Sequence, residues 1–461
     1  MAKDKLTDYD STASGNLDVG GISVAEGMLP SGVNNAMREQ MSHLADFAAG
    51  TSGVDVLKLQ DDTDTNSIKL QAPASVTATT TFTLPDGDGA SGQAMITDGA
   101  GTLSWAAPYG NRNLIINGAM QVWQRGTSAD TATAGDYMSD RWRIGHGSLD
   151  GNVDWDQETA STPDGFGYAL KVSTDASETS LDAGDTLFIQ QRFEGQDLQQ
   201  LQKGTSGAKS LTLSFWVKSS VASTYTAELY DADNARSISK SYAINTADTW
   251  EFKTVTFEGD TTGAFDNDNA YSFQLGIWID AGSNFTSGTF STAWQSNTNN
   301  ERVYDTTGWL ESLSPEFYIT GIQLEVGETA TPFEHRSYGD ELARCQRYYQ
   351  QQGRDGSGGR LFGVQQSSNY GILGIDFPQT MRSAPTFTLY GGNSTTGNIT
   401  VSGASAGSTI AANATNSVTV QPSLMHFNWN NTLSASNTSK AIWHDMGTAA
   451  TMLSYTLDAE L

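Results

Sequence analysis

The chain has 461 residues, of which 37% are hydrophobic and 17% are charged. Its 25 Lys and Arg against 52 Asp and Glu give a formal net charge of −27, which argues against nucleic acid as a partner because phosphates attract cations. The single cysteine, Cys345, excludes an intrachain disulfide framework and a cysteine-cluster metal site. The 47 glycines and the Ser-, Thr- and Asn-rich tracts predict a mainly β fold with many turns.

The sequence shows neither the apolar segment of a signal peptide nor that of a membrane-spanning helix. The N-terminal residues are polar, and no run of about 18 apolar residues occurs. We therefore expect no signal peptide and no membrane insertion, in a protein made in a cytoplasm.

The first predicted element is a helix at 33–48, within an N-terminal segment at 1–50. Its apolar residues recur at helical spacing and form one stripe: Val33, Met37, Met41, Leu44, Phe47 and Ala48. Because so short a helix is marginal on its own in water, we expect this stripe to be buried against a partner.

Short strand-sized runs follow between 51 and 110, separated by Asp-Gly and Gly-rich turns. They are VDVLKLQDD (54–62), SIKLQAP (67–73), ATTTFTLPDGDG (78–89) and QAMITDGAGTLSW (93–105). This segment predicts a short β shaft that is too thin to bury a core as a single copy.

Longer alternating runs between 111 and 338 predict an antiparallel β-sandwich. One strand places Leu211, Leu213, Phe215 and Val217 on one face, and another does the same with Phe273, Leu275, Ile277 and Ile279, so these residues should line the core.

The opposite faces of the same two strands carry candidate ligand-binding residues. They are Trp216 with Lys218 on one strand and Gln274 with Trp278 on the other. Because the core positions are already filled by other residues, each indole either stacks on a ligand or is covered by another element. Sugar rings offer apolar faces for stacking, with Gln274 and Lys218 available for hydroxyl groups. The alternative is a subunit or domain interface.

A second short helix is predicted at 339–352 and interpreted as a neck. Leu342, Cys345 and Tyr349 are spaced three and four residues apart, so they share one face of that helix. After a Gly-rich stretch, residues 353–461 contain several short alternating runs and predict a small C-terminal β domain.

Catalytic and metal motifs are weak. The five histidines have no metal-binding spacing, and no nucleophile-elbow setting or distinct carboxylate pair is found, so no catalytic residue is assigned. Asp266 and Asp268 are candidate calcium ligands in the loop AFDNDNAY, against the alternative of a turn with solvated acids. We otherwise expect no cofactor.

Two distant segments resemble the body-to-neck module of bacteriophage tail fibre and tail-spike-like proteins, especially those of marine phages. The first combines RNLIINGAMQVWQRG (112–126) with DYMSDRW (136–142), and the second is GIQLEVGETATPFEHRSYGDELARCQRYYQ (321–350). Between them, SFWVKSS and WEFKTVTFEGDTT are similar to the jelly-roll sandwich of carbohydrate-binding modules.

The flanking segments are similar to other parts of the same fibres. The segment 22–47 resembles their virion-attachment region, 83–106 their shaft repeats, and FPQTMRSAPTFTL (377–389) their distal β domain. The resemblance implies an elongated homotrimer located in the virion. The stripe at 33–48 would then bury itself in a trimeric bundle or on a tail hub, tube or adaptor protein, and Leu342, Cys345 and Tyr349 would face a three-fold axis.

The resemblance also implies a function, which is attachment by the N-terminus to the phage tail and adhesion to host surface polysaccharide or lipopolysaccharide. Two alternatives stay open. One is a tail connector or adaptor fibre without receptor binding, and the other is a polysaccharide depolymerase.

Overall fold

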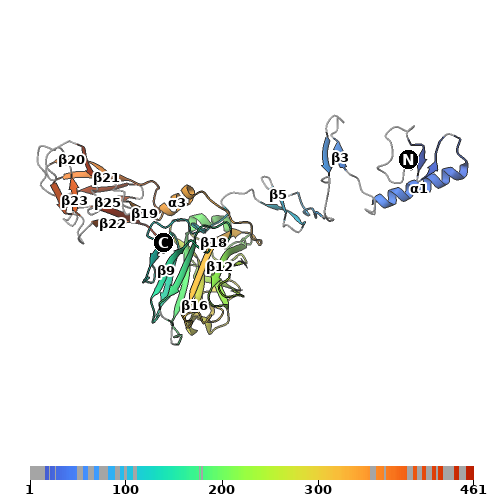
Figure 1. Ribbon diagram of the computed structural model, residues 1–461. Helices are drawn as coiled ribbons and strands as arrows, with labels where there is room; N and C mark the ends of the chain where they lie inside the picture. The colour runs from blue at the N-terminus through green and yellow to red at the C-terminus, as the bar shows by residue number, and fades with distance from the viewer. Residues whose placement is uncertain are drawn as a thin grey trace. The chain divides into compact units, whose positions relative to one another are not determined.

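The structure of the protein is a computed structural model (Figure 1). It describes residues 16–19, 21–25, 27–48, 56–60, 67–71, 81–88, 94–97, 101–106, 112–175, 177, 180–352, 360–367, 370–391, 398–401, 408–411, 418–421, 424–428, 441–445 and 453–461. The chain divides into two compact units, Met1–Pro108 and Tyr109–Leu461, and each is described by itself.

The first unit contains the helix α1 (Pro30–Ala48) and small antiparallel hairpins. The hairpins are β1 (Asp18–Val19) with β2 (Ile22–Ser23), β3 (Val56–Gln60) with β4 (Ser67–Gln71), and β5 (Ala94–Thr97) with β6 (Leu103–Ala106). The predicted N-terminal helix is therefore confirmed. It begins earlier than expected, at Pro30, because the missing N–H of proline costs nothing at the first helical position.

The apolar stripe of α1 is not buried within the first unit. The helix packs on β1 and β2 through another face, on which Ala36 and His43 are buried. Val33, Met37, Met41, Leu44 and Phe47 are all exposed, Met41 to 67%. The side chain of Ala48 lies outside the described residues.

The second unit is built on a sandwich of two antiparallel six-stranded sheets (Figure 1). In spatial order, the first sheet contains β15 (Glu251–Phe257), β12 (Leu211–Ser219), β18 (Glu316–Val326), β10 (Ala169–Thr174), β9 (Val153–Glu158) and β7 (Ser128–Ala129). The second contains β17 (Gln295–Ser296), β14 (Arg236–Ala243), β13 (Thr224–Asp231), β16 (Tyr271–Ala281), β11 (Thr186–Glu194) and β8 (Arg143–Gly147). Short helical turns lie between strands: η3 (Gly195–Leu201), α2 (Ser283–Thr286) and η4 (Asn299–Glu301).

The core lies between the two sheets, where the alternation of β12 and β16 predicts it. Every residue expected to line it is buried: Leu211, Leu213, Phe215, Val217, Phe273, Leu275, Ile277 and Ile279. Trp142 and Trp309 are also fully buried in this cluster. The mainly β, antiparallel fold class is thus confirmed, and the core has the two-sheet arrangement that period-two strands require.

Among the described C-terminal residues, the strands form three further antiparallel sheets. One has the order β19 (Tyr349–Gln352), β28 (Leu453–Asp458), β22 (Thr386–Gly391). A second has the order β25 (Val418–Gln421), β26 (Leu424–Asn428), β21 (Tyr370–Asp376), β20 (Arg360–Ser367), β27 (Ala441–Asp445). The third pairs β23 (Asn398–Val401) with β24 (Ser408–Ala411).

The predicted neck helix is wrong in its second half. The helix α3 (Tyr338–Gln346) begins after the N-cap Ser337, whose hydroxyl accepts a hydrogen bond from the Asp340 N–H, and it ends before Arg347. The residues of β19 follow as a strand paired with β28. Because β28 lies far along the sequence, local periodicity could not reveal this pairing.

The predicted three-fold face of the neck is corrected as well. Cys345 and Tyr349 are buried inside a single chain, whereas Leu342 is only partly buried. The guanidinium of Arg125 lies 3.6 Å from the ring centroid of Tyr349, and burial raises the pKa of the Cys345 thiol. Two of the three residues therefore stabilise the fold of this unit and are not available to a symmetry axis.

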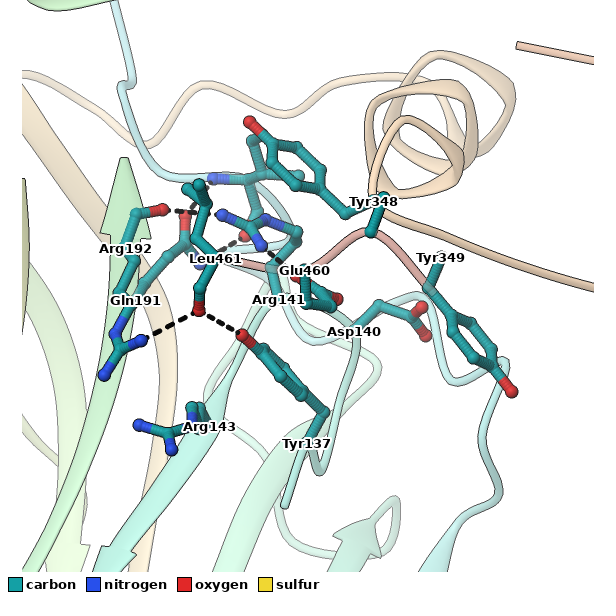
Figure 2. Close-up of polar contacts among 12 residues, drawn as sticks. Tyr137, Asp140, Arg141, Arg143, Gln191, Arg192, Tyr348, Tyr349, Glu460 and Leu461 are labelled. Carbon is teal, nitrogen blue, oxygen red and sulfur yellow. Dashed lines mark hydrogen bonds and ion pairs between the residues drawn. The ribbon is translucent and has the colours of Figure 1, made fainter. Parts of the chain in front are cut away.

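The last residues of the chain are held on the sandwich, as Figure 2 shows. The carbonyl oxygen of Leu461 accepts hydrogen bonds from the Tyr137 hydroxyl at 3.0 Å and from Arg192 at 2.9 Å. The carboxylate of Glu460 forms ion pairs with Arg141 and Arg125. We name this set of contacts the C-terminal join. It fixes β28, and through β28 also β19, to the sandwich.

Among the described residues, no helix has the length and apolar character needed to cross a bilayer.

Candidate functional site

The outer face of the first sheet carries aromatic side chains at its β15 edge. On β12, Phe215 and Val217 point into the core, so Trp216 points outward between them. Trp216 lies opposite Phe252 of β15, and their ring centroids are 5.4 Å apart. Phe252 is 50% exposed. Exposed aromatic rings on an edge strand are costly unless they contact something, which makes this face a candidate binding surface.

These two rings form part of a groove with a volume of about 280 Å³. We use "the groove" for the space lined by Phe166, Ser214, Trp216, Phe252, Gly321, Thr331, Pro332, Phe333 and His335. Ser214, Trp216, Phe252 and Gly321 come from strands of the sheet, and the others come from two loops. The first loop (159–168) connects β9 to β10, and the second loop (327–337) follows β18. A concave site with aromatic walls and few polar groups is typical of ligand binding.

Gly321 lets the first loop approach the sheet closely. Its φ of +63° is a left-handed conformation that glycine adopts without strain. A Cβ at this position would lie 2.6 Å from the ring of Phe166, so that ring rests directly on the backbone of β18. The pairing of β12 with β18 also shifts register between Ser214 and Trp216, which is the sign of a bulge.

The first loop is tied down at three points. The indole N–H of Trp250 donates to the carbonyl of Ser161 at 2.9 Å. Within the loop, the hydroxyl of Thr162 donates to the carbonyl of Phe166 at 2.6 Å. The hydroxyl of Thr320 on β18 donates to the carbonyl of Tyr168 at 2.7 Å. The Phe166 side of the groove is thus preformed rather than dependent on a ligand.

The second loop is held by a buried polar network. The Glu325 carboxylate accepts hydrogen bonds from the N–H and the hydroxyl of Thr331, at 2.8 Å and 2.6 Å, and from the Gln323 amide at 2.8 Å. Arg112 donates to the carbonyl of Pro332 at 3.2 Å. The Asn113 N–H donates to the Glu334 carboxylate at 2.8 Å. The two segments that resemble phage fibres, 112–126 and 321–350, therefore meet here and shape the groove.

Charged groups border the groove on the same sheet. The ammonium of Lys218 lies 3.9 Å from the ring centroid of Tyr318, and Lys171 pairs with Glu316 at 2.7 Å. Burial works to raise the pKa of Glu316, but hydrogen bonds from Lys171 and Tyr318 outweigh burial and lower it. Burial, followed by the hydrogen bond to Glu316, raises the pKa of Tyr318. These groups add polar contacts beside the aromatic surface.

Only half of the predicted glycan site lies together. Trp216 and Lys218 are on the outer face of the first sheet, but Gln274 and Trp278 belong to β16 in the second sheet. The four candidate glycan-binding residues therefore do not form one site, and that prediction is corrected. They lie on different sheets of the sandwich.

Trp278 has no face free for a ligand. It is 1% exposed, with its ring centroid 4.5 Å from that of Phe188 and 5.6 Å from that of Phe285. Its indole N–H donates to Glu228 at 2.9 Å, and Arg302 forms a bidentate pair with the same carboxylate at 2.7 Å and 2.8 Å. The segment after β16 covers this indole, which is the alternative that the sequence left open.

Gln274 is also buried, and its side-chain oxygen accepts a hydrogen bond from the Tyr271 hydroxyl at 2.8 Å. It therefore supports the second sheet and is not a free hydrogen-bonding group on a surface.

Sequence reasoning missed most of the groove. Phe252 stands on a predicted strand with visible alternation, so its outward position could have been read from the pattern. Phe166, Phe333 and His335 lie on loops, and their ring centroids are 4.9 to 5.4 Å apart. No local periodicity reports such contacts between distant loops.

The candidate calcium loop contains exposed acids. Asp266 and Asp268 are both exposed, and Asp268 accepts a hydrogen bond from the N–H of Ala270 at 2.9 Å. Across the residues that the structure describes, no three His, Cys, Asp or Glu side chains come close enough to hold a metal ion. We therefore describe this loop as a hydrogen-bonded turn and propose no calcium site in it.

Comparison with known proteins gives similarity at the level of solved structures alone. No family model matches the chain, and no curated protein matches it. The enzymatically active domain of tailspike protein 4 from bacteriophage CBA120 is 13% identical with a TM-score of 0.24, over 43% of this chain and 21% of that one. A family 61 carbohydrate-binding module in complex with β-1,4-galactotriose is 11% identical with a TM-score of 0.25, over 47% of this chain and all of that one.

A family 11 carbohydrate-binding module of a cellulosomal cellulase from Clostridium thermocellum is 14% identical with a TM-score of 0.22, over 43% of this chain and all of that one. Similarity at this level assigns no function to the chain, so a functional hypothesis has to rest on the groove itself.

Proposed function

We propose that the protein is a homotrimeric bacteriophage tail fibre that binds polysaccharide or lipopolysaccharide on the host surface through the groove. One observation carries the binding function: an outward tryptophan and a half-exposed phenylalanine lie side by side on an edge of the sheet, in a preformed concave site. Sugar rings present apolar C–H faces to such rings, while bordering polar groups bind hydroxyls.

The phage part of the proposal rests on different support. The residues that resemble tail fibres are the same residues whose hydrogen bonds hold the second loop. The exposed stripe of α1 supports an N-terminal segment that joins other copies and a tail hub, tube or adaptor protein. Several trimers on one virion would make weak glycan contacts useful through avidity. The site of action is the virion.

We propose binding without catalysis. Hydrolysis of a glycosidic bond ordinarily needs a pair of carboxyl groups on either side of the scissile bond. The residues lining the groove, all within the described part of the chain, include no Asp and no Glu. This composition favours an adhesin over a depolymerase.

The test is binding of the full-length protein to arrayed bacterial surface polysaccharides and to host cells, with released reducing sugar followed in parallel. Trp216→Ala should weaken glycan binding at least about tenfold, which corresponds to about 1.4 kcal/mol. Tyr304→Ala, an exposed aromatic on the segment that covers the second sheet, is the matched control and should bind as the wild type does. Equal binding by both variants would contradict the groove as the site.

Two other results would support the rival functions. No binding by the wild-type protein would favour a connector fibre, and release of sugar would favour a depolymerase.

A further inference from the structure

The groove is closed at one end. At β18 the ring of Phe166 lies on the backbone of Gly321, so close that a Cβ there would be 2.6 Å from it. A sugar ring cannot pass between Phe166 and the sheet. Hydrogen bonds from Trp250 to the carbonyl of Ser161 and from Thr320 to the carbonyl of Tyr168 hold the backbone of the first loop on either side of this ring.

The two loops also meet above this closed end. The ring centroid of Phe166 is 5.1 Å from that of Phe333 and 5.4 Å from that of His335. Phe333 and His335 are themselves 4.9 Å apart. These three rings form a continuous wall from the first loop to the second. The network of Gln323, Glu325 and Thr331 holds the second loop in place.

The opposite end of the groove is open. It is bordered by β15, the edge strand of the sheet, where Phe252 is half exposed. A ligand can therefore enter along the edge, stack on Phe252 and Trp216, and reach the wall. The volume of about 280 Å³ lies at the small end of ligand sites, which suits a short portion of a glycan.

We infer that the groove recognises the end of a glycan chain, or of a side branch, and does not let a continuous chain pass through. The inference rests on the proposed glycan-binding function and specifies the class of ligand. The terminal sugar lies against the wall of Phe166, Phe333 and His335, and the following unit stacks at Trp216 and Phe252. Units farther from the end lie beyond β15 in solvent.

The first experiment measures affinity against chain length. The full-length protein is titrated with oligosaccharides of one to six units, prepared from each bacterial surface polysaccharide that it binds on the array, with the fluorescence of its tryptophans as the signal. In the series that binds, the affinity should rise from one unit to two and then stay constant within about twofold. An affinity that keeps rising through five or six units would overturn the inference, while leaving glycan binding intact.

The second experiment counts chain ends. Equal masses of the matching polysaccharide, intact and partially hydrolysed, are compared for the amount of protein that they bind at saturation. End recognition predicts that bound protein increases in proportion to the number of ends. An unchanged or lower capacity after hydrolysis would overturn the inference.

A control separates this inference from the proposed function. Trp216→Ala should bind both polysaccharide samples at least about tenfold more weakly, whereas Tyr304→Ala should keep the dependence on chain ends. If the wild type binds no arrayed bacterial polysaccharide, the proposed function fails and the inference fails with it; if it binds one without dependence on chain ends, only the inference fails.

Discussion

Lys203 shows how one residue can take the place of a bound cation. Its ammonium is buried and pairs with Asp231 at 2.5 Å and Asp260 at 3.1 Å. It also donates to the carbonyl oxygens of Thr262 and Gly263, at 2.8 Å and 2.7 Å. Two carboxylates and two carbonyls thus surround a positive charge that the chain supplies itself. Removing that charge would leave Asp231 buried without its cation.

We therefore predict that Lys203→Met destabilises the sandwich by about 3–5 kcal/mol, the usual cost of breaking a buried ion pair from one side. The control is Lys240→Met, whose partner Glu258 is exposed, and it should cost about 0–1 kcal/mol. The free energy of unfolding from urea titration, followed by tryptophan fluorescence, measures both. Similar losses in the two variants would show that the Lys203 cluster has no special stabilising role.

At the level of elements, sequence patterns located the strands but not what covers them. The alternation of β12 and β16 correctly placed both core faces, because period two is a property of a single strand. Trp216 and Trp278 have the same outward position, yet one lines a groove and the other is buried by Phe285 and its neighbours. The difference arises because the segment after β16 folds back over Trp278. The spacing of residues within one strand cannot predict such a long-range contact. The failure at β19 has the same cause, since its partner β28 is remote.

The helix α1 carries a prediction at this scale. Its exposed stripe is proposed to bury itself between copies, so a double variant with Met37→Glu and Met41→Glu should convert trimers into monomers, because buried glutamates are costly. The control is Asn35→Glu with Ser42→Glu, which adds the same charge at exposed positions on the side of the helix opposite the stripe. Light scattering coupled to size exclusion gives the mass. A monomeric wild type, or a trimeric double variant, would contradict the proposal.

At the scale of the whole second unit, the C-terminal join connects the beginning and the end of the C-terminal region to the sandwich. Asp140 is buried beside it, where Gln124 donates two hydrogen bonds to its carboxylate and Arg125 lies 3.6 Å away. Burial raises the pKa of Asp140 to about 6, although Arg125 and the hydrogen bonds from Gln124 oppose the shift. Between about pH 4 and 6, the folded protein therefore holds a proton here that the unfolded chain has released.

The sign of the pH dependence follows from linkage. Between about pH 4 and 6 the folded state binds more protons at Asp140 than the unfolded state does, so this group lowers the free energy of unfolding as pH rises. Relative to Asp140→Asn, the wild type should lose on the order of 3 kcal/mol across that window. Asp136→Asn, at an exposed position nearby, is the control and should show the wild-type slope. Parallel curves for wild type and Asp140→Asn, from urea titrations at each pH, would contradict the shift.

The pairing of β19 with β28 has a consequence for how this protein can diversify. The two strands lie side by side, with Tyr349 opposite Asp458, so the chain departs from the sandwich and returns to it at one place. A chain segment whose two ends lie side by side can be replaced by a segment of different length without changing the path of the chain before or after it. Recombination at these two strands would replace all residues between β19 and β28 together. The groove and its two loops would stay unchanged.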